Sequence, residues 1–214
     1  MLHALAALFA LYMLARYGRG ALLFVAPSLL RVTAEAGAGA RTLAQVRAGE
    51  ALAALGFVRL GGRREAGPLG ALEVRTDAWA SEAEGVYADV RERPDAGGPA
   101  VSFTSRFPDG AFVVTANHPR VALCGPSLQL GGLPGATVEA ALAAHRVAVA
   151  RFARDHGAPT APADLAARLE VARSYARGHG RRELRRHTAM SFVNACIALL
   201  LLLGSMNLMA RRVK

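Results

Sequence analysis

The sequence predicts an α+β domain held at a membrane, and three observations support this fold class. Residues 188–210 form an unbroken run of 23 residues without a charged side chain. A second apolar region occupies residues 1–30. Between them, short segments bounded by Gly, Pro and Asp precede longer segments of helical periodicity. We therefore expect a small antiparallel sheet of about four strands, covered by helices and flanked by an N-terminal membrane segment and a C-terminal transmembrane helix.

The C-terminal apolar run is long enough to cross a bilayer. The hydrocarbon layer is about 30 Å thick and a helix rises about 1.5 Å per residue, so roughly 20 residues are needed. Basic side chains lie on both sides of the run: Arg185 and Arg186 precede it, and the tail 211–214 contains Arg211, Arg212 and Lys214. This arrangement is typical of a transmembrane helix, here over residues 188–210.

The N-terminal apolar region allows two interpretations. Residues 1–15 carry no charge, Arg16 and Arg19 follow, and residues 21–30 are apolar again. A secretory signal has its basic residues before the apolar run, so this order argues against a cleaved signal. Residues 1–31 either span the membrane, with both arginines reaching back to the headgroups, or lie partly in the interface as a helix that Pro27 kinks or ends. Residues 32–41 are small and predict a flexible linker.

The domain is predicted over residues 42–187, and its first helix is capped by Thr42 and ended by Gly56. Strand-like segments follow at 57–60, 72–76, 85–90, 101–107 and 111–115. The last two flank Pro108-Asp109-Gly110 and predict a hairpin. Its apolar positions alternate as Val101, Phe103 and Phe107 on the first strand, and as Phe112, Val114 and Ala116 on the second.

Helices are expected to cover this sheet. After a Gly- and Pro-rich loop over 119–135, Thr137 caps a helix that runs to His156. A second helix is predicted to begin near Pro162, since proline favours the first helical position. Residues 178–180 interrupt it, and a basic juxtamembrane helix leads into the apolar run. The glycine pairs at 61–62, 97–98 and 131–132 lack the context of phosphate-binding loops and predict turns.

Positive charge is concentrated next to the membrane. The formal net charge is +10, the pI is about 11.0 and 53% of the residues are hydrophobic. Residues 57–120 contain 8 basic and 9 acidic residues, whereas residues 146–186 contain 10 basic and 4 acidic ones. This distribution favours anionic lipid headgroups over nucleic acid as the partner. Binding of nucleic acid by the arginines stays a third hypothesis, for which affinity would fall steeply with salt.

Two sets of residues are candidates for membrane contacts. The arginines before the apolar run are expected to meet headgroups, although they could equally serve only as a topology signal. These are Arg173, Arg177, Arg181, Arg182, Arg185 and Arg186. Small and polar residues within the run are expected to pack against another helix, either the N-terminal segment or a second subunit. These are Asn194, Gly204, Ser205 and Asn207.

Catalytic candidates are few. His145 lies on the apolar face of its helix, and we expect it to be a core histidine bonded to the sheet. The only trio of reactive side-chain types close together in sequence is Asp109, His118 and Cys124. The turn already explains the presence of Asp109. We therefore assign no catalytic, cofactor or metal residue.

These observations predict a membrane-anchored, non-enzymatic interaction module or an accessory subunit of a larger membrane assembly. The alternative is a membrane-surface enzyme with a pocket near His118, Cys124 and His145. Because basic residues adjoin both apolar regions on the domain side, we expect a bacterial inner-membrane protein with a cytoplasmic domain, although the basic tail opposes this orientation.

Overall fold

The computed structural model describes residues 2–35, 42–91 and 99–211, and its chain divides into two compact units. One unit consists of residues up to 31, residues 66–73 and the residues from 176 onward. We call it the helical unit. The other consists of residues 32–65 and 74–175, and we call it the sheet unit.

The helical unit contains two long helices, α1 (Leu2–Val25) and α5 (Gly180–Arg211), and the short 3-10 helices η1 (Pro27–Leu29) and η2 (Pro68–Gly70). α1 continues through Arg16 and Arg19 without a break. It ends just before Pro27, as the ring of proline requires. α5 joins the basic juxtamembrane residues and the apolar run in one helix. Both helices are long and apolar enough to cross a membrane.

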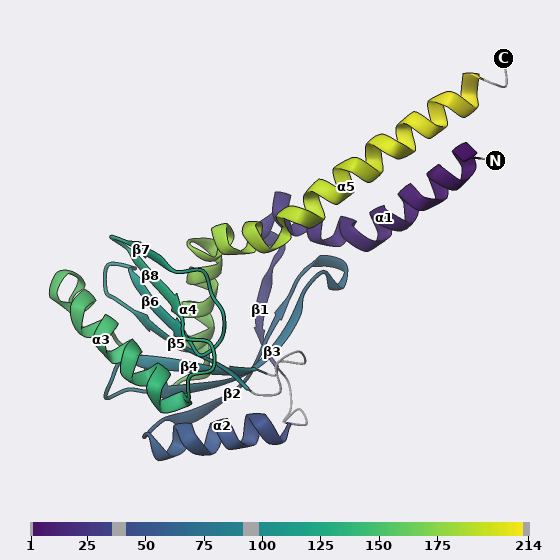
Figure 1. The fold of residues 1–214 in the computed structure, drawn as a ribbon. Helices are drawn as coiled ribbons and strands as arrows, with labels where there is room; N and C mark the ends of the chain where they lie inside the picture. Colours follow the sequence, from purple (N-terminus) through teal and green to yellow (C-terminus); the bar gives the residue numbers. More distant parts are fainter. Residues whose placement is uncertain (1, 36–41, 92–98, 212–214) are drawn as a thin grey trace. The chain divides into compact units, whose positions relative to one another are not determined.

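The sheet unit is built on one mixed sheet of eight strands, so the predicted count of four was wrong. In spatial order the strands are β1-β2-β3-β4-β5-β6-β8-β7 (Figure 1). β6 and β8 are parallel, whereas β3–β4, β4–β5, β5–β6 and β7–β8 are antiparallel. The bounds are β1 Arg31–Ala34, β2 Val58–Ala66, β3 Glu73–Ser81, β4 Val86–Arg91, β5 Ala100–Arg106, β6 Phe112–Ala116, β7 Leu123–Gly125 and β8 Leu128–Gly132.

Helices cover both faces of this sheet. α2 (Leu43–Ala54) and α3 (Val138–His156) share a core with Trp79, Val90 and Phe103 on one face. α4 (Leu165–Arg177) packs on the other face, where its Val171 joins Tyr87 and Phe112. The sheet therefore lies between two helical layers, which explains why every residue of β6 is buried.

The missed strands lie in sequences that look like loops or linkers. β7 and β8 occupy the Gly- and Pro-rich stretch, and β1 begins the region expected to be a linker, whose residues 36–41 lie outside the described part. Two of the glycine pairs predicted to be turns lie inside β2 and β8, while the pair at 97–98 is not described. In β8, a side chain at Gly132 would place its Cβ 2.4 Å from the carbonyl oxygen of His118. Close backbone approach therefore requires glycine there.

The β5–β6 hairpin is confirmed, but its faces differ from the simple alternation. Asp109 accepts a hydrogen bond from the backbone N–H of Ala111 at 3.0 Å, which closes the turn. Phe112 pairs across the strands with Arg106, so it lies on the face opposite Phe103. Since both faces are buried, apolar residues on the two strands do not have to share a face.

Two of the three predicted helix starts are confirmed. Thr42 caps α2 with a complete capping box, and Thr137 caps α3. The prediction for α4 was wrong by one turn. The helix begins at Leu165, because the Asp164 carboxylate accepts the N–H of Ala167 at 2.8 Å and so caps it.

Candidate functional site

The helical unit is a hairpin of two antiparallel helices. α1 and α5 lie side by side, and the two chain termini lie at the same end of the pair (Figure 1). At the other end, the guanidinium Nε of Arg185 donates to the carbonyl oxygen of Phe24 at 3.2 Å. The rings of Phe24 and Phe192 stack there with centroids 4.5 Å apart. These contacts fix the register of the pair.

The seam between the helices combines small side chains with a few large ones. Gly20 permits the closest approach, because a Cβ there would lie 2.6 Å from the Cβ of Ser191. Ala10 and Ala198 are fully buried. Buried and half-buried positions recur every three or four residues, the spacing of left-handed helix pairs. On α1 these are Ala6, Ala10, Met13, Tyr17, Gly20 and Phe24, and on α5 they are Ser191, Ala195, Ala198, Leu202 and Ser205.

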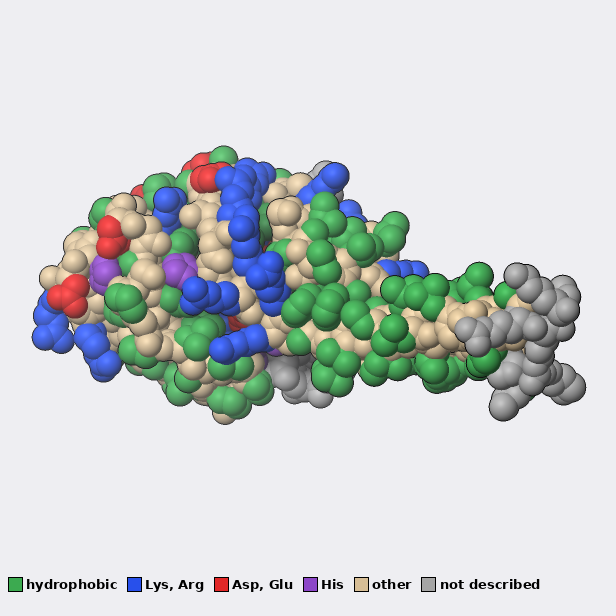
Figure 2. Space-filling view, turned by 90° about the horizontal axis from the view of Figure 1, so that it is seen from above, with side chains coloured by type: hydrophobic (Ala, Val, Ile, Leu, Met, Phe, Trp, Pro, Cys, Tyr) green, Lys and Arg blue, Asp and Glu red, His purple; other side chains and the backbone are tan. Residues whose placement is uncertain are grey.

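Large apolar side chains cover the outside of the hairpin. Figure 2 shows hydrophobic side chains along the length of the helix pair. Leu8 is 63% exposed and Leu200 is 70% exposed. Similar side chains are exposed at Leu5, Phe9, Leu11, Tyr12, Val193, Ile197, Leu199, Leu203 and Met206. A helix that is small on its inner face and apolar on its outer face suits a lipid environment, where close packing and not water exclusion joins helices.

The predicted packing residues are divided between the two faces of α5. Ser205 is buried in the seam and Asn194 is half-buried. Gly204 and Asn207 are exposed, and a Cβ at Gly204 would meet nothing within 4 Å. Contact of these two residues with a further helix stays a prediction.

The predicted basic residues are also divided. Arg173 belongs to the sheet unit, where its Nε donates to the carbonyl oxygen of Val32 at 3.1 Å. The others belong to the helical unit and have exposed side chains, at Arg177, Arg181, Arg182, Arg185 and Arg186. Arg177 is the last residue of α4, and the other four lie in the first turns of α5, at the end of the hairpin opposite the chain termini. Arg173 therefore serves a structural contact, whereas the other five lie just before α5 or at its start.

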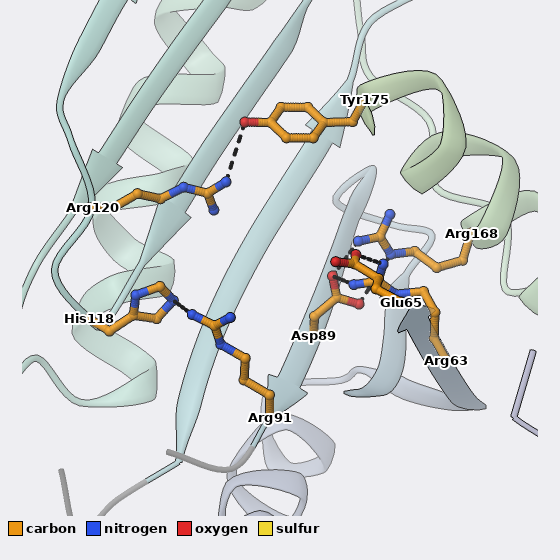
Figure 3. A network of polar contacts seen from close by, with 8 residues as sticks. All are labelled: Arg63, Glu65, Asp89, Arg91, His118, Arg120, Arg168 and Tyr175. Atoms are coloured by element: carbon orange, nitrogen blue, oxygen red, sulfur yellow. Dashed lines mark hydrogen bonds and ion pairs between the residues drawn. The ribbon is translucent and has the colours of Figure 1, made fainter. Parts of the chain in front are cut away.

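The sheet unit contains a buried ionic network that sequence reasoning missed. Asp89 on β4 accepts from Arg63 on β2 at 3.1 Å and from Arg168 on α4, with 3.3 Å to the Arg168 Nε (Figure 3). Glu65 pairs with Arg63. Arg63, Asp89 and Arg168 are each at least nine-tenths buried. Two cations and two anions thus neutralise one another, as buried charges require.

A backbone irregularity delivers Arg63 to this network. Leu60 packs against the α4 face of the sheet, and Arg63 reaches Asp89 on the same face. Residues three apart on a regular strand would point to opposite faces. Gly61 has φ 141°, which glycine alone adopts easily, and this irregular residue between Leu60 and Arg63 accounts for their common face.

The electrostatics of the network favour the charged forms of Asp89 and Arg63. Burial alone would raise the pKa of Asp89, but the charges of Arg168 and Arg63 outweigh it and the pKa is lowered. Burial alone would lower the pKa of Arg63, but Asp89 and Glu65 raise it. Arg168 also lies 5.2 Å from the ring centroid of Tyr87, whose hydroxyl donates to the carbonyl of Pro162 at 3.1 Å. The network therefore joins β2, β4 and α4.

Two further pairs lie near this network. The Arg120 guanidinium donates to the hydroxyl of Tyr175 at 3.3 Å, and a guanidinium nitrogen of Arg91 lies 3.4 Å from Nε2 of His118 (Figure 3). Both pairs connect different segments of the sheet unit. Among the residues described, no three His, Cys, Asp or Glu side chains gather in a way that could hold a metal ion.

Comparison with protein-family models, curated proteins and solved structures finds no match for this chain. The residues and their geometry therefore carry any functional conclusion.

His145 is a core residue hydrogen-bonded to the sheet, as predicted. Its Nε2 lies 3.1 Å from the hydroxyl of Ser105, and its Nδ1 lies 3.0 Å from that of Thr115. Ser105 donates its only hydroxyl proton to the carbonyl of Gly85 at 2.9 Å, so it accepts from His145. The imidazole is thus neutral, with its proton on Nε2 and with Nδ1 accepting from Thr115. Burial lowers its pKa to about 3.

Asp109, His118 and Cys124 do not form a catalytic arrangement. Asp109 and His118 lie beyond opposite ends of β6. Asp109 bonds Nδ1 of His156 at 2.6 Å, and His118 lies next to Arg91. Cys124 is an exposed thiol on the edge strand β7. Each of the three side chains serves a different part of the sheet unit.

Proposed function

We propose that this chain is a membrane-anchored, non-enzymatic interaction module that serves as an accessory subunit of a larger membrane assembly. The observation that carries the proposal is the α1–α5 hairpin, whose seam is small and whose outer face is large and apolar. In hydrocarbon, exposing such an apolar outer face has no free-energy cost. In this proposal residues 1–31 span the bilayer and do not lie in its interface.

The orientation follows from the placement of positive charge. Arg16 and Arg19 on α1 and the arginines at the start of α5 all lie toward the end of the hairpin opposite the chain termini. Positive residues near spans are retained in the cytoplasm. The proposal therefore places the sheet unit in the cytoplasm of a bacterial cell, with anionic headgroups as the ligands of these arginines.

The proposed partner is a second membrane protein or a second copy of the chain. Gly204 and Asn207 lie on the outer face of α5, where a small residue and a side-chain amide can meet another helix. The non-enzymatic role is supported by His145, because both of its ring nitrogens are engaged in the core.

The first experiment is membrane extraction followed by thiol labelling. The chain should stay in the membrane after an alkaline carbonate wash and leave it in detergent; release by carbonate would contradict the proposed hairpin insertion. With Cys196 changed to Ala, Cys124 should react with an impermeant maleimide only after the cells are opened. Labelling of Cys124 in intact cells would reverse the orientation.

The second experiment tests the partner. Purification in mild detergent should yield an assembly larger than one chain, and Asn207→Leu should weaken it, whereas the control Leu200→Ile should not. A lone monomer with no bound protein would contradict the accessory role.

A further inference from the structure

The loop between β2 and β3 belongs to the helical unit. Residues 66–73 pack against α1, where a Cβ at Gly67 would lie 2.9 Å from Cδ1 of Leu23. A Cβ at Gly70 would lie 3.9 Å from a guanidinium nitrogen of Arg19. The N–H of Gly67 donates to the carbonyl of Leu72 at 2.8 Å and closes the loop. The glycines thus bring this loop into direct contact with α1.

The tip of the loop presents an apolar side chain in a strained conformation. Leu69 has φ 53°, and no other non-glycine residue in the described chain has a positive φ. Leucine rarely adopts this left-handed region. Its side chain is nevertheless 73% exposed, more than Leu200 on the outer face of α5. The strain therefore holds a leucine away from the protein and does not serve its packing.

The composition of the loop is that of a lipid contact. Residues 66–72 read AGPLGAL and contain neither a charged nor a polar side chain. Loops that face water usually carry Asn, Asp or Ser beside their Gly and Pro. An apolar loop that is fixed to one helix of the hairpin shares the surroundings of that helix.

The contacts of the loop also set its depth. Gly20 faces Ser191 across the seam, and Leu23, the contact of the loop, lies about one turn closer to the basic end of the hairpin. Ser191 is three residues into the uncharged run that begins at Thr188, which corresponds to about 5 Å. The loop therefore lies at the level where the apolar part of α5 begins, the boundary between headgroups and acyl chains.

We propose that this loop, with Leu69 at its tip, inserts into the interfacial layer of the bilayer as a third point of attachment beside α1 and α5. The inference rests on the proposed membrane location of the hairpin. Pro68 and Leu69 enter the acyl boundary, and Arg19 beside Gly70 reaches the lipid phosphates.

The test is depth-dependent fluorescence quenching with the full chain in vesicles of phosphatidylethanolamine and phosphatidylglycerol. In a background with Cys124 changed to Ser and Cys196 to Ala, an environment-sensitive dye is attached at Leu69→Cys. Ala71→Cys supplies a second position in the same loop. Controls are Ala140→Cys on the first turn of α3 and Leu200→Cys on α5. Fluorescence of Trp79 before labelling confirms that each variant is folded.

Lipids with a shallow nitroxide should quench the dye at Leu69→Cys and Ala71→Cys about twofold or more over the dye at Ala140→Cys, as insertion of several Å into the interface implies. A deep nitroxide should quench most strongly at Leu200→Cys. If Leu200→Cys is quenched while both loop positions behave like Ala140→Cys, the loop proposal is overturned and the membrane hairpin stands. If Leu200→Cys is also unquenched, the membrane location fails and the loop proposal fails with it.

Discussion

The burial of His145 predicts that the sheet unit loses stability in mild acid. In the unfolded chain the imidazole titrates near its ordinary pKa of 6.5, whereas burial in the fold lowers its pKa to about 3. Below pH 6.5 the unfolded chain therefore binds a proton that the folded chain does not, and unfolding becomes easier as the pH falls. At about 1.36 kcal/mol per pKa unit, the free energy of unfolding should fall by about 2 kcal/mol between pH 7 and pH 5. The fall continues to about pH 3.

Trp79 provides the assay. It is the only tryptophan, and it is buried in the core that α2 and α3 share with the sheet. Its fluorescence during denaturant titration of the full chain in detergent reports unfolding of the sheet unit. Asp89 does not interfere, because its pKa is lowered from 3.8 and its contribution is lost only as the pH falls below that range.

The matched variant is His145→Gln. The amide can donate to Ser105 and accept from Thr115, but it has no proton to gain. Its unfolding free energy should be nearly constant between pH 7 and pH 5. If the variant shows the same acid loss as the parent protein, or if the parent loses less than about 0.5 kcal/mol, the assignment of a buried neutral imidazole is wrong.

Three further outcomes are expected. Asp89→Ala removes the carboxylate that the buried Arg63 and Arg168 share and leaves Arg63 with Glu65 alone, so it should lower the free energy of unfolding by about 3–5 kcal/mol in the tryptophan assay. A loss below about 1 kcal/mol would show that water reaches the network. Gly20→Val should separate α1 from α5 and so reduce disulfide formation between cysteines introduced on the two helices. Gly18→Val should leave it unchanged, because a Cβ at Gly18 meets nothing within 4 Å. Gly85→Ala should destabilise the sheet unit more than Gly110→Ala. Both positions have positive φ, but only at the first would a Cβ lie 2.3 Å from a carbonyl oxygen, so equal effects would exclude that clash.

The features predictable from sequence are those with a local cause. The caps at Thr42 and Thr137 and the turn at Asp109 follow from side chains that bond their own neighbouring backbone. The helix over the apolar run of α5 could be predicted because the run is long and uncharged. The core position of His145 follows from helical spacing.

The features that escaped prediction depend on distant partners. β8 is a strand because it pairs with β6, and β7 because it pairs with β8, and their Gly-rich sequence does not signal either pairing. The ionic network joins residues from β2, β4 and α4, and no spacing connects Arg63 to Arg168. The one available signal was Asp89, which apolar residues flank on both sides in β4, since a buried carboxylate requires a cation.

The α1–α5 hairpin has a consequence for the order of assembly. α1 ends at Val25 and α5 begins at Gly180, 155 residues later. At about 5–20 residues per second, a ribosome needs about 8–30 s to pass from one to the other. During that time the small-residue seam of α1 has no helix to pack on, while the whole sheet unit emerges. α1 and α5 can pair only after the residues of the sheet unit have been synthesised, so that unit has time to fold before the helix pair forms.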